Sequence, residues 1–159
     1  MVTFSENSIL SVKHGVVMVH CNTEKTMGDG LAAKVRSLYP QVFPAYKEAC
    51  WAYENDRIKM LGSFCSVQVK KDLWICLAFA QFNMAKYDTN TRPEAYAKIF
   101  RKIRKQMELQ RAIGDGKTIE LHVPSNLGIE GKSDFENDIL PIINREFGDS
   151  KVPCIIDMP

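Results

Sequence analysis

The stretch VVMVHCNTEKTMGDGLA, residues 16–32, decides the fold of this 159-residue chain. It begins with the continuous apolar run Val16–Val19, which is typical of a strand buried on both faces of a sheet. A turn-rich segment follows, and the apolar residues Leu31, Val35 and Leu38 then recur with the spacing of one helix face. The stretch therefore predicts a buried strand, a loop with two glycines and a helix in direct succession.

The alternation of strands and helices continues to the end of the chain. The patterns predict, in order, a helix over 45–53, strands over 64–69 and 73–80, a helix from Pro93 to Gly114, a strand over 119–123, a helix over 135–147 capped by Ser133 or Asp134, and a strand over 152–156. The short connection before Leu73 predicts an antiparallel hairpin. Together these elements predict an α/β sandwich with helices on both faces of a mixed sheet.

Composition and charge exclude several classes of protein. Apolar residues make up 45% and charged residues 25% of the chain, which is ordinary for a globular domain and excludes a disordered one. The net charge is only +2, which argues against a strong binder of nucleic-acid backbones. No apolar run reaches the roughly 20 residues of a membrane span, so we expect no contact with membranes.

The cysteines indicate a reducing environment. There are five of them, an odd number, and no pair has the C-x-x-C spacing of a redox or zinc motif. No His, Cys and Asp cluster has metal-ligand spacing, so we predict neither a metal nor a cofactor. The first residues lack the basic and apolar regions of a signal peptide. We therefore expect a cytoplasmic monomer.

Two junctions between a strand and a helix carry the candidate chemistry. The first is residues 19–32 and the second is residues 123–132, and both contain glycines. In an open α/β sheet, ligands bind beyond the carboxyl ends of the strands. Glycines let backbone N–H groups approach an anion, and a helix N-terminus favours negative charge. The pair of loops predicts a clamp for a diphosphate; the alternative, that both are ordinary turns, stays open at this point.

These residues resemble those of a known family. The run from His20 to Ala32 is similar to the first ligand loop of macro domains, which bind ADP-ribose. The similarity continues through Tyr39-Pro40, Tyr46, Cys50, Leu61-Gly62, Leu73–Gln81 and Pro124–Gly131, and the opening residues Val2–Phe4 and Ile9-Leu10 resemble the first strand and the adenine-side turn of the family. The chain most resembles the branch of the yeast-type ADP-ribose 1''-phosphate phosphatases. The resemblance implies one macro-like domain over residues 1–159, folded as a three-layer α/β/α sandwich with about six strands.

The resemblance also implies a set of binding residues. Ser8 and Ile9 would lie near the adenine, and Asn22 would face the distal ribose. The distal ribose and its phosphate would be wrapped by Met27, Gly28, Asp29, Gly30 and Leu31. The diphosphate would be cradled by the backbone of Ser125, Asn126, Leu127, Gly128, Ile129, Glu130 and Gly131. Gln81 and Phe82 would form part of the pocket wall.

Three positions depart from the pattern of the family. Asp29 replaces a small residue, and its carboxylate would repel a phosphate unless it binds a ribose or acts as a base. Gln81 stands where some ester-cleaving relatives have a lysine, which argues against a lysine-dependent reaction. Asn7 and Ser8 occupy the turn where many macro domains have an adenine-side acidic residue.

His20 is the candidate general acid–base, because it ends a buried strand beside the expected cleft and histidine titrates near neutrality. The alternative is a buried histidine whose ring is satisfied by backbone partners. Asp29 or Asp134 would orient water or polarise His20; for Asp134 the alternative is an acid at a helix N-terminus. We interpret His122, which alternates with apolar neighbours in a strand, as structural.

These observations predict an enzyme that removes the terminal phosphate of ADP-ribose 1''-phosphate. One alternative is a hydrolase that removes ADP-ribose from modified protein or nucleic acid, in which case the partners include ADP-ribosylated macromolecules. The other is a reader that only recognises ADP-ribose. The basic residues of the helix that begins at Pro93 are interpreted as a solvated face rather than a nucleic-acid surface.

Overall fold

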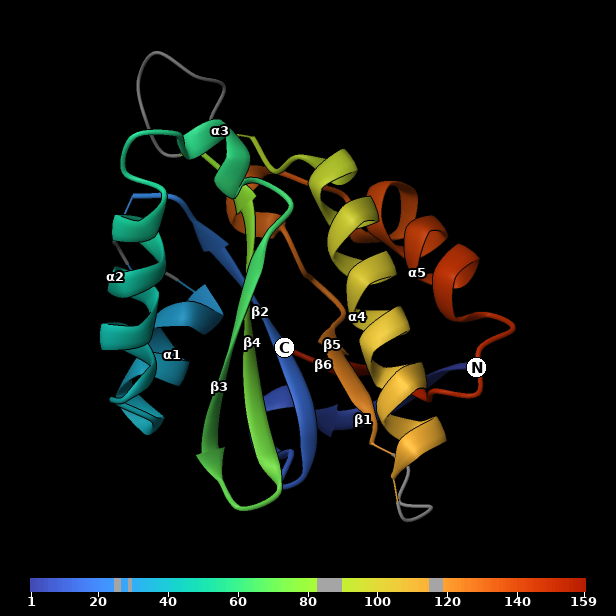
Figure 1. Cartoon of the computed structure of the whole chain (residues 1–159). Helices are drawn as coiled ribbons and strands as arrows, with labels where there is room; N and C mark the ends of the chain where they lie inside the picture. Colours follow the sequence, from blue (N-terminus) through green and yellow to red (C-terminus); the bar gives the residue numbers. More distant parts are fainter. Residues whose placement is uncertain (25–26, 29, 83–89, 115–118) are drawn as a thin grey trace.

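The computed structural model describes residues 1–24, 27–28, 30–82, 90–114 and 119–159. Its centre is a six-stranded sheet with the order β1-β6-β5-β2-β4-β3 (Figure 1). The strands are β1 (Val2–Ser8), β2 (Gly15–Asn22), β3 (Phe64–Lys70), β4 (Leu73–Gln81), β5 (Leu121–Pro124) and β6 (Cys154–Met158). The α-helices are α1 (Gly30–Leu38), α2 (Val42–Ala52), α3 (Arg57–Met60), α4 (Pro93–Ile113) and α5 (Leu140–Phe147). Short turns of other helix types are η1 (Ile9–Ser11), η2 (Ile129–Gly131) and η3 (Phe135–Ile139).

The sheet is mixed, as the sequence predicts. Every neighbouring pair of strands is parallel except β3 and β4, which form the predicted antiparallel hairpin. Because β2, β4, β5 and β6 run in one direction, their carboxyl ends lie at the same edge of the sheet. This edge collects the loops that follow β2, β4 and β5.

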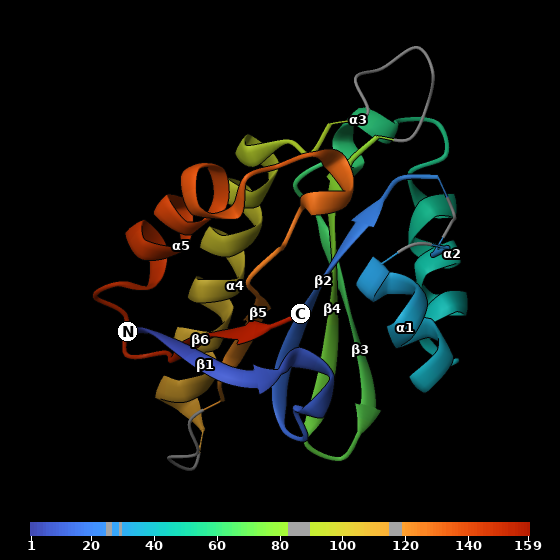
Figure 2. The same cartoon turned by 180° about the vertical axis from the view of Figure 1, so that it is seen from behind.

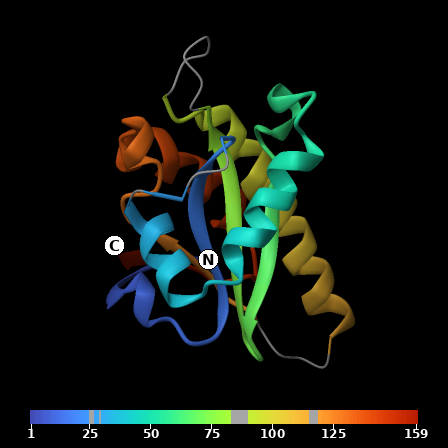
Figure 3. The same cartoon turned by 90° about the vertical axis from the view of Figure 1, so that its left-hand side faces the viewer.

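Helices cover the sheet on both faces. Figure 1 shows α4 and α5 on one side, and Figure 3 views the molecule from the other side, with α1 and α2 in front of the sheet. One hydrophobic cluster lies between the sheet and α4 and α5, around Met18, Phe100 and Phe147. A second lies under α1 and α2, around Val19 and Tyr46. The predicted three-layer sandwich is therefore confirmed.

Some element boundaries differ from the prediction. The second helix starts at Val42 rather than Ala45, because Pro44 falls in its first turn, where a missing N–H costs no hydrogen bond. Helix α3 was not predicted; the Asp56 carboxylate starts it by accepting from the N–H of Lys59. The last strand begins at Cys154 rather than Val152.

The helix after the second loop has an irregular start. Asp134 is its N-cap, as predicted, and accepts hydrogen bonds from the N–H groups of Glu136 and Asn137. The first turn, η3, is a π-helix, and α5 continues from Leu140 with Pro141 in its first turn. Gly148 ends the helix, as predicted.

Within the part of the chain that the structure describes, no helix combines the length and the apolar character that a membrane crossing requires.

Candidate functional site

The loops that follow β2 and β5 meet at the carboxyl edge of the sheet. The Glu130 side chain reaches from the second loop to the first residue of α1, where a Cβ added to Gly30 would collide with its carboxylate. Gly30 has a φ of +58°, a left-handed conformation that favours glycine. The two glycine loops predicted from the sequence are therefore neighbours in space.

The second loop is fastened to the end of β4 through Thr91. The Thr91 N–H donates to the Gly131 carbonyl (2.9 Å), and its hydroxyl donates to the Gly128 carbonyl (2.7 Å). A Cβ on Gly131 would collide with Thr91 and lie 2.9 Å from the Gln81 amide oxygen. Glycine at position 131 thus allows the second loop to pack directly against the end of β4.

His20 lies at the centre of this junction, with both ring nitrogens occupied. Its Nε2 is 2.7 Å from Gln81 Oε1, and its Nδ1 is 2.5 Å from the Tyr96 hydroxyl. An amide oxygen only accepts, so Nε2–H donates to Gln81 and the Tyr96 hydroxyl donates to Nδ1. The ring is 7% exposed. Both ring nitrogens of His20 are therefore satisfied within the protein, as in the alternative interpretation. The partners are side chains and not backbone groups.

Burial lowers the pKa of His20, and this effect outweighs the hydrogen bond to Gln81 and the charge of Glu130, which both raise it. Burial also raises the pKa of the Tyr96 hydroxyl well above its usual value. The neutral pair is therefore the stable state near pH 7. An acid–base role for His20, which remains a prediction, requires Gln81 or Tyr96 to release a ring nitrogen.

Asn22 ends β2 at the mouth of the first loop. Its Oδ1 accepts from the Tyr46 hydroxyl (2.6 Å) and from the N–H of Glu24 (2.9 Å). These two contacts fix the orientation of the half-buried amide. Tyr46 itself is fully buried in the cluster under α2.

The other predicted residues of the first loop lie in different environments. Met27 is buried in the hydrophobic cluster under α1 and α2, and Leu31 packs against that cluster. Gly28 is exposed, and a Cβ there would meet nothing within 4 Å. Asp29 lies outside the described residues.

In the second loop, four of the seven amides of the predicted cradle are already used. The N–H groups of Ser125, Leu127, Ile129 and Gly131 donate to the carbonyls of Asp157, Pro124, Asn126 and Gly128, respectively. Among the described residues, the N–H groups of Asn126 and Gly128 have no such acceptor. Leu127 is buried, whereas the side chains of Ile129 and Glu130 are exposed. Asn126 and Gly128 are the amides that this loop still offers to a ligand.

Asp134 is engaged in capping. Besides the two N–H groups of η3, its carboxylate accepts from the Asn137 side chain (2.6 Å). The anion-binding capacity of this helix N-terminus is thereby used by the protein's own carboxylate. The catalytic role of Asp134 remains a prediction.

The remaining predicted residues flank the junction. Ser8 caps η1, since its Oγ accepts from the N–H of Leu10, and Ile9 is buried behind it. Phe82 is buried at the end of β4, and the guanidinium of Arg92 lies over its ring, 5.4 Å from the centroid.

Two buried polar atoms at this edge have no hydrogen-bond partner. They are the Thr23 hydroxyl oxygen and Arg92 Nε, and they are the only such side-chain atoms among the described residues. Thr23 follows β2, and Arg92 precedes α4 with its N–H bonded to the Ala80 carbonyl (2.7 Å). An orphaned buried polar atom indicates a missing water or ligand. Both orphans belong to the edge where the two loops meet.

The sequence analysis missed the contributions of Tyr96, Thr91 and Arg92. Tyr96 lies on the buried apolar face of α4 with Ile99 and Phe100, and this spacing gives no sign that its hydroxyl reaches His20. Thr91 and Arg92 stand directly before Pro93, where polar residues commonly flank a helix start. Only their position just before a predicted helix could have drawn attention to them.

Within the described ranges, no group of three His, Cys, Asp or Glu side chains is arranged to hold a metal ion. All five cysteines are free. Burial raises the pKa of the Cys21 thiol, the one nearest the loops, well above its usual value, so a reactive thiolate is disfavoured.

Comparisons with known proteins bear on the fold. No family model matches the chain, and no curated protein matches it in sequence. Among solved structures, the macrodomain of Mycobacterium tuberculosis DarG superposes with a TM-score of 0.77 at 19% identity, over 100% of this chain and 98% of that one. A macrodomain protein from Streptomyces coelicolor gives 0.73 at 20% identity, over 100% and 99%.

A third similar structure is that of Thermosipho africanus DarTG in complex with ADP-ribose. It gives a TM-score of 0.72 at 19% identity and covers 99% of this chain but 42% of that one. Identities this low carry information on the fold alone. Six strands in a mixed sheet, helices on both faces and these superpositions together lead to one conclusion: the chain has the macrodomain fold.

Proposed function

We propose that the chain binds an ADP-ribose derivative at the edge where the loops after β2 and β5 meet. The observation that carries this proposal is the pair of orphaned buried atoms, Thr23 Oγ1 and Arg92 Nε, beside two glycine loops. The complex of Thermosipho africanus DarTG with ADP-ribose, part of which has the same fold, supports it.

Specific groups are suited to each part of such a ligand. The N–H groups of Asn126 and Gly128 would donate to the diphosphate, together with the N-terminus of α1. The fixed amide of Asn22 would face the distal ribose. Backbone amides and Arg92 would supply the attraction for phosphate, since the chain has a net charge of only +2.

Calorimetry with ADP-ribose tests the binding proposal, with AMP and ribose 5-phosphate as partial ligands. We expect saturable one-to-one binding of ADP-ribose and much weaker binding of either part. Arg92→Gln should weaken binding roughly tenfold, the cost of one charge-assisted hydrogen bond. The matched control is Arg111→Gln at the far end of α4. No heat of binding with ADP-ribose at millimolar concentration would refute the proposal.

For the chemical step, the proposed reaction is hydrolysis of the terminal phosphate of ADP-ribose 1''-phosphate. Asn22 would hold the ribose, and His20, with Asp29 or Asp134, would activate water. Release of inorganic phosphate from ADP-ribose 1''-phosphate measures this activity directly. ADP-ribosylated protein and nucleic acid, assayed for release of ADP-ribose, test the alternative hydrolase.

A reader without catalytic activity is the second candidate, and a specific observation favours it. Both ring nitrogens of His20 are already bonded to Gln81 and Tyr96, so this ring is not available to a water molecule in this arrangement. Tight binding of ADP-ribose with no phosphate release would establish the reader. Phosphate release that His20→Gln abolishes, while ADP-ribose binding persists, would instead establish the phosphatase.

A further inference from the structure

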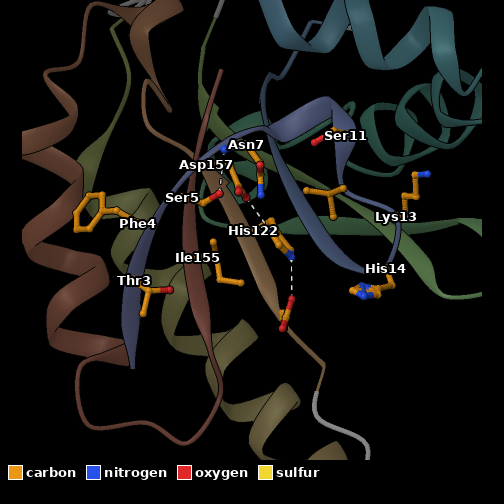
Figure 4. A pocket seen from close by; sticks show the side chains of 12 residues that line it. Thr3, Phe4, Ser5, Asn7, Ser11, Lys13, His14, His122, Ile155 and Asp157 are labelled. Carbon is orange, nitrogen blue, oxygen red and sulfur yellow. Dashed lines mark hydrogen bonds and ion pairs between the residues drawn. The ribbon is translucent and has the colours of Figure 1, made fainter.

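A cavity of about 540 Å³ lies apart from the strand-end loops. Its walls are residues of β1, β5 and β6, Glu120 just before β5, and the segment from Ser11 to His14 that leads into β2 (Figure 4). The volume is within the range of small-molecule sites, about 300–1,000 Å³. None of the residues that line it belongs to the proposed ADP-ribose site.

The floor of the cavity carries a histidine held between two carboxylates. His122 Nδ1 is 2.6 Å from Asp157 Oδ2, and His122 Nε2 is 3.1 Å from Glu120 Oε2 (Figure 4). A neutral imidazole has a single N–H, so both contacts are hydrogen bonds only when each ring nitrogen carries a proton. A proton on Nε2 makes His122 a hydrogen-bond donor on the side of Glu120.

The two carboxylates are not equally fixed. The Asp157 side chain is 2% exposed, and its backbone carbonyl accepts from the N–H of Ser125, so it is anchored on both sides. The Glu120 side chain is 37% exposed and its contact is longer. An incoming group can therefore replace Glu120 at Nε2, whereas Asp157 stays in place and keeps the ring oriented.

The opposite wall offers further donors. In Figure 4, Lys13 and His14 lie on the other side of His122 from Thr3 and Ile155. Among the described residues, the Lys13 ammonium has no ion-pair partner. Ser5 Oγ accepts from the N–H of Asn7, which leaves its hydroxyl proton for another acceptor. Lys13 and Ser5 thus offer a cationic donor and a hydroxyl donor to the cavity. Glu120 is the carboxylate in it that a ligand could replace.

We propose that this cavity is a second binding site, which takes the phosphate or carboxylate group of a small metabolite. The anion accepts from His122 Nε2–H in place of Glu120 and pairs with Lys13. The inference is independent of what binds at the strand-end loops.

Nuclear magnetic resonance of the full chain, with ADP-ribose present at saturating concentration, tests the site. The probes are sodium phosphate, sodium acetate and, as the opposite charge, methylammonium chloride, all at one pH and constant ionic strength. We expect phosphate or acetate to shift the ring resonances of His122 and the amides of Thr3 and Lys13 along one saturable curve. Whichever anion binds more tightly identifies the ligand group.

Three variants and one control sharpen the test. Glu120→Gln should tighten anion binding about threefold and Lys13→Gln should weaken it about threefold, the usual effect of one partly exposed charge. His122→Gln should abolish anion binding. If that variant fails to fold, Glu120→Gln and Lys13→Gln decide the test. Glu6→Gln, on the same strand as Thr3 but outside the cavity, makes the same change in net charge as Glu120→Gln and should have no effect. Linear shifts without saturation, an equal effect of Glu6→Gln, or preference for methylammonium would overturn the proposal.

Discussion

At the scale of single residues, Thr23 shows how a ligand site differs from a hydrophobic core. Its side chain is fully buried, and its hydroxyl has no partner among the described residues. Burying a hydroxyl without a hydrogen bond costs about 1–3 kcal/mol. A fold selected for stability alone would have valine at this position.

Thr23→Val should therefore raise the free energy of unfolding by about 1 kcal/mol, since it keeps the volume and removes the orphaned hydroxyl. The same variant should bind ADP-ribose more weakly if the hydroxyl bonds the ligand directly or through water. Urea unfolding and calorimetry measure the two effects. Thr3→Val, at an exposed position, is the matched control, and a loss of stability in Thr23→Val would contradict the expectation.

A second prediction concerns His20 and the pH dependence of the free energy of unfolding. Burial holds the pKa of His20 in the folded protein below its usual 6.5. As the pH falls below 6.5, the unfolded chain binds a proton that the folded protein does not, so stability declines until the pH reaches the lowered pKa. At pH values above 6.5, the contribution of the neutral His20 ring to the free energy of unfolding is fully present.

The variant His20→Gln lacks this linkage. Between pH 7.5 and 5.5 its stability should fall less than that of the parent protein, by up to about 1.4 kcal/mol for each pH unit. Urea unfolding at several pH values measures the slope, and His14→Gln at an exposed position serves as control. Equal slopes in the parent and in His20→Gln would show that burial does not hold this ring neutral.

At the scale of elements, the junction of the second loop with β4 has no room for a side chain at position 131. Gly131→Ala places a Cβ against Thr91 and 2.9 Å from Gln81 Oε1, so the loop must move away from the strand. We expect a loss of about 2 kcal/mol in stability, as for an overpacked core, and a large loss of ADP-ribose affinity.

Gly28→Ala is the contrasting substitution, because a Cβ there meets nothing within 4 Å. It should change stability by less than about 0.5 kcal/mol, the usual effect of an exposed substitution. A drop in ADP-ribose affinity without a drop in stability would place Gly28 against the ligand. Thermal unfolding and calorimetry of both variants together separate a packing role from a binding role.

The helices and strands also show how much of the fold can be predicted from the sequence. The apolar run Val16–Val19 and the hairpin before Leu73 were recognisable because strand burial and short turns leave local patterns. The start of α2 was misplaced, since Pro44 reads as a break although a first turn tolerates it. The partners of His20 were beyond reach, because Tyr96 and Gln81 come from separate elements and meet it only in the folded sheet.

At the scale of the whole molecule, the cysteines report on the integrity of the fold. Cys21, Cys50, Cys76 and Cys154 are buried, and only Cys65 is half-buried. Burial raises the pKa of Cys76 and of Cys154 to about 12, and it raises that of Cys65 as well. Thiolate is the reactive form, so both access and ionisation protect these thiols.

Alkylation with iodoacetamide at pH 8 should therefore modify Cys65 first in the folded protein. The other four should react only at the rate at which the structure opens, and all five should react at once in urea. Mass spectrometry of peptides gives the rate at each site, with Cys65→Ala as the control. Reaction of Cys21 as fast as Cys65 without denaturant would mean that the first loop opens readily.

The order of the sheet has a consequence for synthesis on the ribosome. Among the described residues, strand β1 pairs only with β6, so Val2 cannot form its strand pairing until Cys154 has been synthesised (Figure 2). At 5–20 residues per second, this wait lasts about 8 to 30 s. During that time the nascent chain carries an unpaired strand, whereas β2, β3 and β4 can already assemble. Chaperones that hold β1, or a pause in translation before residue 154, should affect the yield of folded protein more than events within the hairpin.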